Sequence, residues 1–294
     1  MRVVVAGSSG MLGTALVARL RKEGHEVLRL VRRTPHGPDE RGWDPPAGRI
    51  DAGALDGVDA VVNLCGAGIG DRRWSQARKQ LLIDSRIEPT EVLAAEVAAH
   101  GVPVLLNASA VGYYGDTDGR TADESGSAGR DFAADLCSQW EAATEAAQAA
   151  GTRVVRTRTA PVLARKGGLL GPLRPLFFLA LGARLGNGRQ HMPWIHLDDQ
   201  IDAMMFLLTS DISGPVNLAS PIPTTNAEFT AAFAKALRRP AVFAVPSFAL
   251  KFVLGELADA VLMTQRVTPK VLLDNGFRFT FTAIDDALAA VESK

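Results

Sequence analysis

The stretch RVVVAGSSGMLGTALVARL, residues 2–20, decides the fold of this chain. It opens with a continuous apolar run, Arg2–Ala6, which is typical of a strand buried on both faces in a parallel sheet. Apolar residues then follow helical spacing from Leu12 to Leu20, and Gly24 ends this helix. A strand, a glycine-rich turn and a helix in this order predict the first part of a βαβ unit.

The turn between the strand and the helix contains three glycines with the spacing G-x-x-G-x-x-G. Glycines here allow a tight turn, a close approach of the backbone to a pyrophosphate and close packing of the helix on the strand, and the helix offers free N–H groups to phosphates. Because the spacing lies inside a βαβ unit, it predicts a dinucleotide site, with a merely structural turn as the alternative. The residues that we expect to hold the cofactor here are Gly7, Ser9, Gly10, Met11, Leu12 and Gly13.

The end of the second predicted strand, Glu26–Val31, indicates which dinucleotide is bound. An NAD-specific site carries Asp or Glu about 20 residues after the glycines, where the carboxylate accepts hydrogen bonds from ribose hydroxyls. This chain instead reads Val31, Arg32 and Arg33. Guanidinium groups bind a 2′-phosphate through charge-assisted hydrogen bonds, whereas a carboxylate repels it. We therefore predict NADP(H) as the cofactor; the alternative is a pair of solvated arginines at a strand end.

Further strands and helices alternate along the first half of the chain. The predicted strands cover residues 59–64, 103–109 and 152–159, and helical patterns cover residues 86–100 and 132–150. Strands that alternate with helices of this length imply right-handed βαβ crossovers. The predicted fold class is α/β, with a Rossmann-type doubly wound parallel sheet.

The pattern loosens after Ala160, where glycines and prolines become frequent. Helix signals return at residues 198–209, at a capping box formed by Thr225 and Glu228, and between Thr268-Pro269 and Asn275-Gly276. We predict a cofactor domain over residues 1–160, to which residues 196–220 return. A smaller C-terminal α/β lobe over residues 161–195 and 221–294 is expected to cover the substrate.

Composition excludes several classes of partner. The 32 Lys and Arg residues balance the 32 Asp and Glu residues, so no net basic field attracts nucleic acid or an anionic membrane, and a small-molecule substrate is expected instead. The run before Gly7 is too short for a signal peptide, and no apolar run approaches the roughly 18 residues of a membrane span. Two distant cysteines, Cys65 and Cys137, fit small buried side chains in a reducing, cytoplasmic setting. The sequence leaves the oligomeric state open.

Other catalytic chemistries lack their motifs. The five histidines show no paired ligand spacing such as H-E-x-x-H, so no metal site is predicted. The chain also lacks the G-x-S-x-G elbow of an α/β-hydrolase and the G-K-[ST] ending of a P-loop. Hydrolysis of esters or of nucleoside triphosphates is therefore not expected.

Several segments together resemble the extended short-chain dehydrogenase/reductases, and among them the YfcH-like group of NAD-dependent epimerase/dehydratase family proteins. They extend over almost the whole chain and read GSSGMLG, NLCGAG, RRWSQARKQLLIDSR, NASAVGYYG, DFAADLCSQWE and MPWIHLDD, followed by the part from VPSFAL through LLDNGFRF. This last part resembles the C-terminal domain of unknown function in that group. The resemblance implies a nicotinamide cofactor on a Rossmann-type fold.

Carried over position by position, the resemblance implies more residues beside the cofactor. It places Arg86 near the phosphates or ribose of the cofactor, although an arginine at a helix start is usually only solvated. The residues that it places at the border of the cofactor, after the strand at 59–64, are Leu64, Cys65, Gly66 and Ala67.

The resemblance also implies roles for two later segments. Pro161 and Val162 match the place where related enzymes close over the nicotinamide. His196, Asp198 and Asp199 match a strand-to-helix motif that joins the two domains. The simpler alternative for Asp198 is a helix N-cap.

The chain departs from the family at the catalytic pair. Extended reductases use a tyrosine and, four residues later, a lysine on the helix after the fifth strand. The corresponding positions here are Phe132 and Leu136, and neither side chain can transfer a proton. Ser109 matches the assisting serine. Tyr114 is the better match to the family's YG tyrosine, but Ser109 lies four residues before Tyr113 and five before Tyr114, so both tyrosines are candidates.

Two functions follow from these observations. The leading hypothesis is an NADP(H)-dependent oxidoreductase or epimerase that acts on an unknown small carbonyl or hydroxyl compound. In this hypothesis Tyr113 or Tyr114, with Ser109, polarises the substrate oxygen. The second hypothesis is a non-catalytic NADPH-binding protein that senses redox state, since a fold can persist after its catalytic pair is lost. The retained serine and tyrosines favour the enzyme.

Overall fold

The first strand, β1 (Arg2–Ala6), lies inside an eight-stranded sheet in the computed structural model, which describes residues 1–293. The strand order is β12-β8-β6-β5-β1-β2-β3-β4, and each neighbouring pair is parallel except β3 and β4. The order reverses between β1 and β5, which confirms the predicted doubly wound α/β class. The other strands are β2 (Glu26–Val31), β3 (Glu40–Asp44), β4 (Arg49–Ile50), β5 (Ala60–Asn63), β6 (Val104–Ala110), β8 (Arg153–Thr159) and β12 (Gly214–Leu218).

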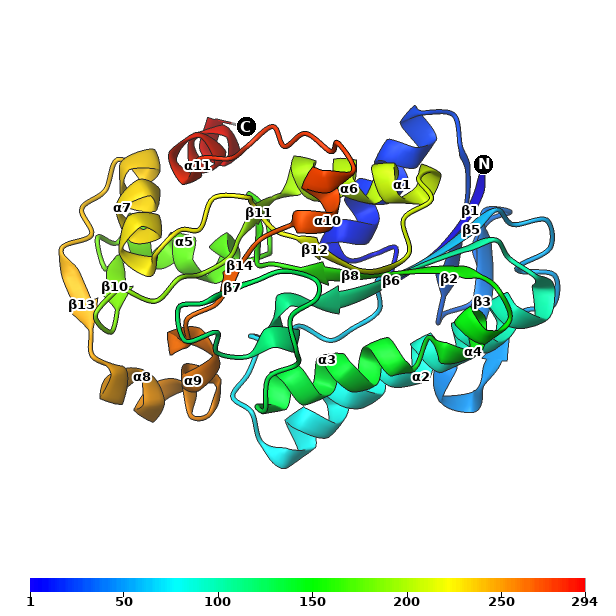
Figure 1. Ribbon diagram of the computed structural model, residues 1–294, viewed down its shortest axis with the longest axis horizontal. Coiled ribbons are helices and arrows are strands. Elements are labelled where there is room, and N and C mark those ends of the chain that lie inside the picture. Colours follow the sequence, from blue (N-terminus) through cyan, green and yellow to red (C-terminus); the bar gives the residue numbers. More distant parts are fainter. Residues whose placement is uncertain (294) are drawn as a thin grey trace.

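Helices cover both faces of this sheet (Figure 1). Val3 and Val5 of β1 pack in one apolar layer with Leu16 of α1, whereas Val4 packs in the opposite layer with Leu93 of α2. All five side chains are fully buried, which explains why the strand is a continuous apolar run. One face carries α1 (Met11–Lys22) and α6 (Leu197–Thr209), and the other carries α2 (Gln76–His100), α3 (Phe132–Ala142) and α4 (Glu145–Ala149).

Several elements differ from the sequence prediction, and three of the differences have a clear local cause or form. Helix α2 begins at Gln76, ten residues before the predicted start, because the Ser75 side chain accepts a hydrogen bond from the Arg78 N–H and caps the helix. The helix predicted at 132–150 is divided into α3 and α4 around Thr144. Strand β3 was not predicted, since its sequence ERGWD lacks a hydrophobic run.

The C-terminal lobe lies on the left side of Figure 1 and has an apolar core of its own, which includes Leu170, Trp194, Phe233 and Leu288. The predicted capping box is present at Thr225. Strands β10 and β13 form a parallel pair in this lobe. Its elements are α5 (Leu170–Phe178), β10 (Ala183–Leu185), α7 (Asn226–Leu237), β13 (Phe243–Val245), α8 (Ser247–Leu254), α9 (Leu257–Leu262) and α11 (Ile284–Ser293).

Two segments cross between the lobe and the main sheet. Residues 196–220 add the edge strand β12 to the main sheet and the helix α6 to one of its faces. The segment around α10 (Lys270–Asp274), predicted to belong to the C-terminal lobe, packs instead on the cofactor-domain core through Val267, Leu272 and Phe277. The physical reason is a strand pair, because β14 (Arg266–Val267) runs parallel to β7 (Thr121–Ala122).

The strand-to-helix motif at the start of α6 connects the two parts. His196, not Asp198, caps this helix, since the His196 Nδ1 atom accepts a hydrogen bond from the Asp198 N–H at 3.1 Å. Asp199 is buried and accepts hydrogen bonds from the N–H groups of Thr280 and Phe281 at 2.8 and 2.9 Å. The motif therefore attaches the C-terminal segment to α6.

Candidate functional site

The glycine turn between β1 and α1 has the geometry of a dinucleotide loop. Gly7 has φ +74°, and a Cβ atom there would lie 2.7 Å from the Leu64 carbonyl carbon. A Cβ atom on Gly13 would lie 2.3 Å from the Gly7 carbonyl oxygen, so a side chain at Gly13 would push α1 away from the loop. Gly10 is less restricted, with its nearest contact at 3.4 Å. Glycine is thus required at the turn and where the helix packs on it.

The amino end of α1 presents unused hydrogen-bond donors. The Thr14 N–H is the first to enter the helical ladder, since it donates to the Gly10 carbonyl at 2.8 Å. The N–H groups of Met11, Leu12 and Gly13 have no acceptor among residues 1–293. The first turn carries no acidic side chain, and Ser9 at the tip of the loop is exposed. Free donors and the positive end of the helix dipole make a fitting cradle for a pyrophosphate.

The two arginines after β2 have different surroundings. Arg33 donates two hydrogen bonds to the buried carboxylate of Glu40, at 2.7 and 2.8 Å. These bonds, with one from the His36 N–H, lower the pKa of Glu40 to about 2. Arg32 is exposed and has no ion pair among the described residues, while Val31 before it is half-buried. Arg32 is therefore the arginine that is available to a 2′-phosphate.

The loop after β5 lies beside the glycine turn. Leu64 touches Gly7, and the Cys65 N–H donates to the side chain of Asn63 at 3.1 Å. Burial raises the pKa of the Cys65 thiol to about 12, and the nearby positive charge of Arg32 opposes this rise. The thiol is thus an unreactive side chain at the carboxyl edge of the sheet.

Arg86 lies directly beneath this loop. Its guanidinium donates to the carbonyls of Ala67 and Leu82, at 2.9 and 3.0 Å, and lies 5.0 Å from the centre of the Trp140 ring. A Cβ atom on Gly66 would lie 3.1 Å from it. The side chain is only 8% exposed and has no carboxylate partner among residues 1–293, and burial lowers its pKa. Arg86 therefore holds the loop in shape and leaves a positive charge under it.

Pro161 and Val162 follow β8 at the same edge of the sheet. Pro161 is exposed, whereas Val162 is buried in β9 (Val162–Leu163), which pairs with β11 (Ile195–His196). The following loop returns to the glycine turn, since a Cβ atom on Gly168 would lie 3.4 Å from the Met11 sulfur. The structure thus brings the predicted nicotinamide segment and the predicted pyrophosphate segment together.

The predicted catalytic serine lies in a buried polar network. The Ser109 hydroxyl donates to the Glu141 carboxylate at 2.7 Å, and Glu141 accepts two hydrogen bonds from Arg158 at 2.8 Å each. Arg158 donates to the Tyr114 hydroxyl at 3.0 Å, and that hydroxyl donates to the side chain of Asn217 at 2.7 Å. Every group in this network is thereby satisfied inside the protein.

Two of the predicted catalytic residues, Ser109 and Tyr114, belong to this network. The hydroxyl protons of Ser109 and Tyr114 are already donated to protein acceptors, and both side chains are less than 5% exposed. Burial raises the pKa of Tyr114 to about 12. In this arrangement both hydroxyl protons are used inside the protein, and both residues help to hold the buried network together.

Tyr113 differs from its neighbour. Its half-buried ring packs on the Arg158 guanidinium, 3.4 Å from the ring centre, and meets the Tyr114 ring edge-on. Its hydroxyl has no hydrogen bond to any described residue. Tyr113 is therefore the predicted catalytic residue whose hydroxyl is open to a ligand.

Neither position of the missing catalytic pair, Phe132 or Leu136 on α3, carries an acid or a base. Leu136 is buried, and Phe132 meets the Trp74 ring edge-on at 5.1 Å between centres. Lys79 from α2 lies 4.8 Å from the centre of the Phe132 ring and forms an ion pair with Glu256 of the C-terminal lobe. Sequence reasoning missed Trp74 and Lys79, although both lie in the quoted RRWSQARKQ stretch, because nothing in a helical pattern shows what a residue contacts.

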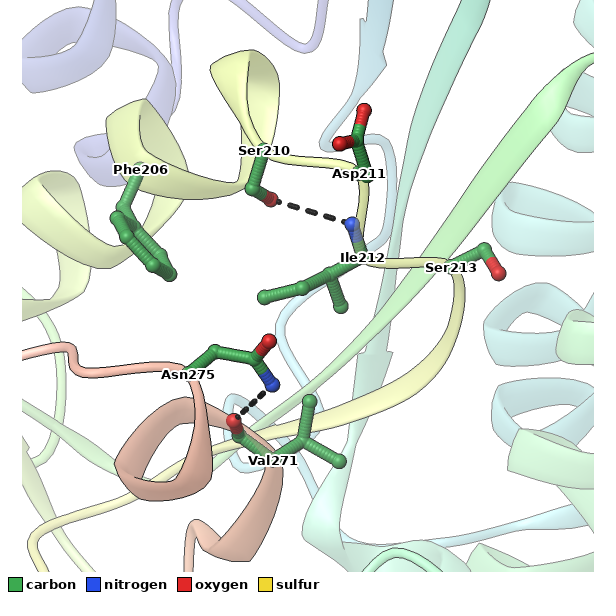
Figure 2. A pocket seen from close by; sticks show the side chains of 7 residues that line it. All are labelled: Phe206, Ser210, Asp211, Ile212, Ser213, Val271 and Asn275. Atoms are coloured by element: carbon green, nitrogen blue, oxygen red, sulfur yellow. Dashed lines mark hydrogen bonds between the residues drawn. The ribbon is translucent and has the colours of Figure 1, made fainter.

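Two cavities lie outside the glycine loop. One of about 560 Å³ lies between the end of α6 and α10, where Phe206, Ile212 and Val271 form apolar walls (Figure 2). Its lining residues 210–213 come directly before β12. The cavity is therefore at the amino edge of the strands, away from the cofactor loop. A second, of about 280 Å³, is lined by Asp116, Asn187 and Thr264 among others, near the loop that follows Tyr114.

Metal-binding and membrane-spanning features are absent from residues 1–293. That range contains no group of three or more His, Cys, Asp or Glu side chains arranged to hold a metal ion. In the same range, no helix is both long and apolar enough to cross a membrane.

Known proteins resemble this chain over its whole length. Epimerase family protein ML0860 of Mycobacterium leprae (strain TN) is 54% identical over 289 residues, which is 98% of this chain and 94% of the relative. Epimerase family protein SDR39U1 of Bos taurus is 38% identical over 299 residues, 99% of each chain.

Solved structures agree. A crystal structure of human epimerase family protein SDR39U1 (isoform2) with NADPH has a TM-score of 0.90 and 33% identity, covering 100% of this chain and 99% of that one. The fold alone is shared with the UDP-glucose 4-epimerase of Thermus thermophilus, at TM-score 0.78 and 18% identity over 99% and 98% of the two chains. Residues 245–291 match a domain of unknown function. Residues 3–219 match the model of the NAD dependent epimerase/dehydratase family, as the motifs indicated, and the chain belongs to that family.

Proposed function

We propose that this protein binds NADP(H) and reduces a small carbonyl compound. The observation that carries the cofactor choice is Arg32, an exposed arginine without an acidic partner among the described residues, at the end of β2. The three free N–H groups at the start of α1 supply the donors for the pyrophosphate. A relative with 33% identity over the whole chain was solved with NADPH, which supports the same choice.

In this proposal each residue of the site has a separate role. NADPH supplies a hydride when it is bound. The Tyr113 hydroxyl donates a hydrogen bond to the carbonyl oxygen of the substrate. When the hydride reaches the carbonyl carbon, this oxygen takes the hydroxyl proton, and water then reprotonates Tyr113. Arg158 holds the Tyr113 ring from one side, and Pro161 closes the site over the nicotinamide.

Reduction is favoured over epimerisation or alcohol oxidation. Oxidation of an alcohol requires a base that removes a proton, and Phe132 and Leu136 cannot accept one. Donation of a hydrogen bond to a carbonyl requires no such base. We therefore expect slow carbonyl reduction near neutral pH and a much weaker reverse reaction.

The test is a panel of aldehydes and ketones followed by the loss of NADPH absorbance. Tyr113→Phe removes the open hydroxyl and should lower turnover by about tenfold or more, as expected for the loss of one general-acid or hydrogen-bonding group. Ser109→Ala, a variant in the buried network, separates an indirect effect on folding from a direct one. An unchanged rate in Tyr113→Phe would exclude Tyr113 from catalysis.

The second candidate is a non-catalytic NADPH-binding protein. The specific observation in its favour is that Ser109 and Tyr114 are both occupied in a buried network. If no carbonyl in a broad panel is reduced while NADPH binds tightly, this function replaces the first. In either case we propose a small-molecule ligand and a cytoplasmic setting, without nucleic acid or membrane, on the basis of the balanced charge and the two free cysteines.

A further inference from the structure

The loop at residues 66–75, between β5 and α2, is bound at its start by side chains of α2. The Ala67 N–H donates to the Ser85 hydroxyl at 3.0 Å, and Arg86 donates to the Ala67 carbonyl at 2.9 Å. Arg78 donates to the Gly68 carbonyl. Helix α2 thus holds the start of the loop at two neighbouring residues, Ala67 and Gly68.

The loop and the first part of α2 are rich in positive charge. Five cationic side chains lie there: Arg72 and Arg73 on the loop, and Arg78, Lys79 and Arg86 on α2. Two of them are paired with carboxylates: Arg78 with Asp71 at 3.6 Å, and Lys79 with Glu256 at 2.5 Å. The others have no carboxylate partner among residues 1–293.

Arg72 and Arg73 are exposed, and two details show that the positive charge behind them is packed closely and only partly compensated by described residues. The buried Arg86 lies near enough to Arg78 for the like charge to lower its pKa further, beyond the larger effect of burial. The Arg78 side chain is only 13% exposed, and its Nε atom is buried without a hydrogen-bond partner among the described residues. Binding of an anion stabilises like charges that are packed together, and it also gives the buried donor a hydrogen-bond acceptor.

The loop extends from the glycine turn toward α3 and the C-terminal lobe. The loop starts at Gly66, beside the glycine turn, and its Trp74 contacts Phe132, the position of the family's catalytic tyrosine. Arg73 reaches the C-terminal lobe, since a Cβ atom on Gly255 would lie 3.2 Å from its guanidinium. We assign the cofactor phosphates to the start of α1 and to Arg32, which lie in other segments. The cluster is therefore not needed to bind the cofactor.

We propose that Arg72 and Arg73, supported by the cluster behind them, bind an oxyanion on the substrate, either a phosphate or a carboxylate carried by the small carbonyl compound. Guanidinium groups bind both kinds of anion through paired hydrogen bonds. Trp74 and Phe132 form the apolar wall beside it. The inference rests on the proposed function for the identity of the ligand as a substrate.

The test is calorimetric titration of the NADP⁺-loaded protein at low ionic strength with glycerol phosphate, glycerate and glycerol. The first two probes distinguish a phosphate from a carboxylate, and glycerol is the neutral control. Wild type should bind at least one of the two anions and not glycerol. The double variant Arg72→Gln/Arg73→Gln should weaken this binding by roughly tenfold or more.

The matched control removes two positive charges elsewhere. Arg49 and Arg120 have side chains that are 74% and 83% exposed, so Arg49→Gln/Arg120→Gln should bind the anion like wild type. Equal affinities in the two double variants, binding of glycerol, or no binding of either anion by wild type would each overturn the inference. NADPH affinity should be unchanged in Arg72→Gln/Arg73→Gln. The same titrations are repeated with the cofactor-free protein. Failure of wild type to bind NADPH would then count against the proposed function alone, because the two double variants are still compared.

Discussion

Arg32 and Arg33 follow one another at the end of β2, yet among the described residues only Arg33 has an acidic partner. Removal of Arg32 should therefore affect the cofactor and leave the fold intact. A hydrogen bond to a charged group contributes about 1.5–3 kcal/mol, so we expect Arg32→Ser to weaken NADPH binding roughly ten- to 150-fold and to leave NADH binding almost unchanged. Titration of both dinucleotides into wild type and variant measures this.

Arg33→Ser is the matched control. It breaks the pair with Glu40 and should lower the melting temperature more than Arg32→Ser does, because it leaves a buried carboxylate without its main partner. If wild type binds NADPH and NADH equally well, the assignment of Arg32 to the 2′-phosphate is wrong.

The two tyrosines of the chain allow a second test at the level of one residue. In Tyr113→Phe, Tyr114 is the only tyrosine left, and burial should raise its pKa to about 12, well above the ordinary value of about 10. Because the folded pKa is above the unfolded one, the stabilisation is complete below about pH 10 and is lost as the pH rises toward 12.

Alkaline titration of the tyrosinate absorbance in Tyr113→Phe measures this pKa directly. The melting temperature of the same variant should fall as the pH rises above about 10, more steeply than that of the variant without either tyrosine. A titration midpoint at about pH 10 in the folded protein would show that Tyr114 is solvated and that the network does not enclose it.

At the scale of the element, the turn from β1 into α1 depends on two glycines more than on the third. A side chain at Gly13 meets the Gly7 carbonyl, so Gly13→Ala should destabilise the protein by about 1–3 kcal/mol, the usual cost of overpacking, and abolish NADP(H) binding. Gly10→Ala has ordinary contacts and should keep the melting temperature of wild type. Thermal melting and calorimetry of both variants provide the measurement, and equal melting temperatures would contradict the argument.

The secondary-structure elements could be predicted where local chemistry decides them. The apolar run of β1, the glycine turn and the Thr225 capping box each depend on residues a few positions apart. The start of α2 could not be predicted in the same way. Its first turns are polar and basic, since they face the loop at 66–75 and not an apolar layer, so hydrophobic periodicity gives no signal there.

At the scale of the whole molecule, the C-terminal segment is attached by the carboxylate of Asp199. It accepts hydrogen bonds from two backbone N–H groups, of Thr280 and Phe281. Asp199→Ala should leave both donors unsatisfied and lower the free energy of unfolding by about 1–3 kcal/mol. Hydrogen exchange at the two amides should rise in this variant, whereas Asp211→Ala, at an exposed position, should change neither quantity. Unchanged protection of the two amides would refute the attachment.

The candidate site shows why long-range contacts limit prediction from sequence. The glycine loop and Arg32 could be predicted, because one βαβ unit contains them. Ser109 and Tyr114 have the chemistry of catalytic residues, yet their partners Glu141 and Asn217 are 32 and 103 positions away. Only the packing of β8, β12 and α3 shows that these hydroxyls are consumed internally. The family resemblance identified Ser109 and Tyr114 as candidate residues, but it did not show whether a ligand can reach their hydroxyl groups.

The buried pair of Glu141 and Arg158 also constrains how this chain can evolve. Loss of one partner leaves an uncompensated buried charge, at a cost of about 3–5 kcal/mol, whereas exchange of both for apolar residues of similar volume is close to neutral. Replacement of the ion pair by two apolar residues therefore requires two nearly simultaneous substitutions. Descendants of this sequence should carry both ionic residues or neither, and the hydroxyl at position 109, which depends on Glu141, should be gained and lost with them.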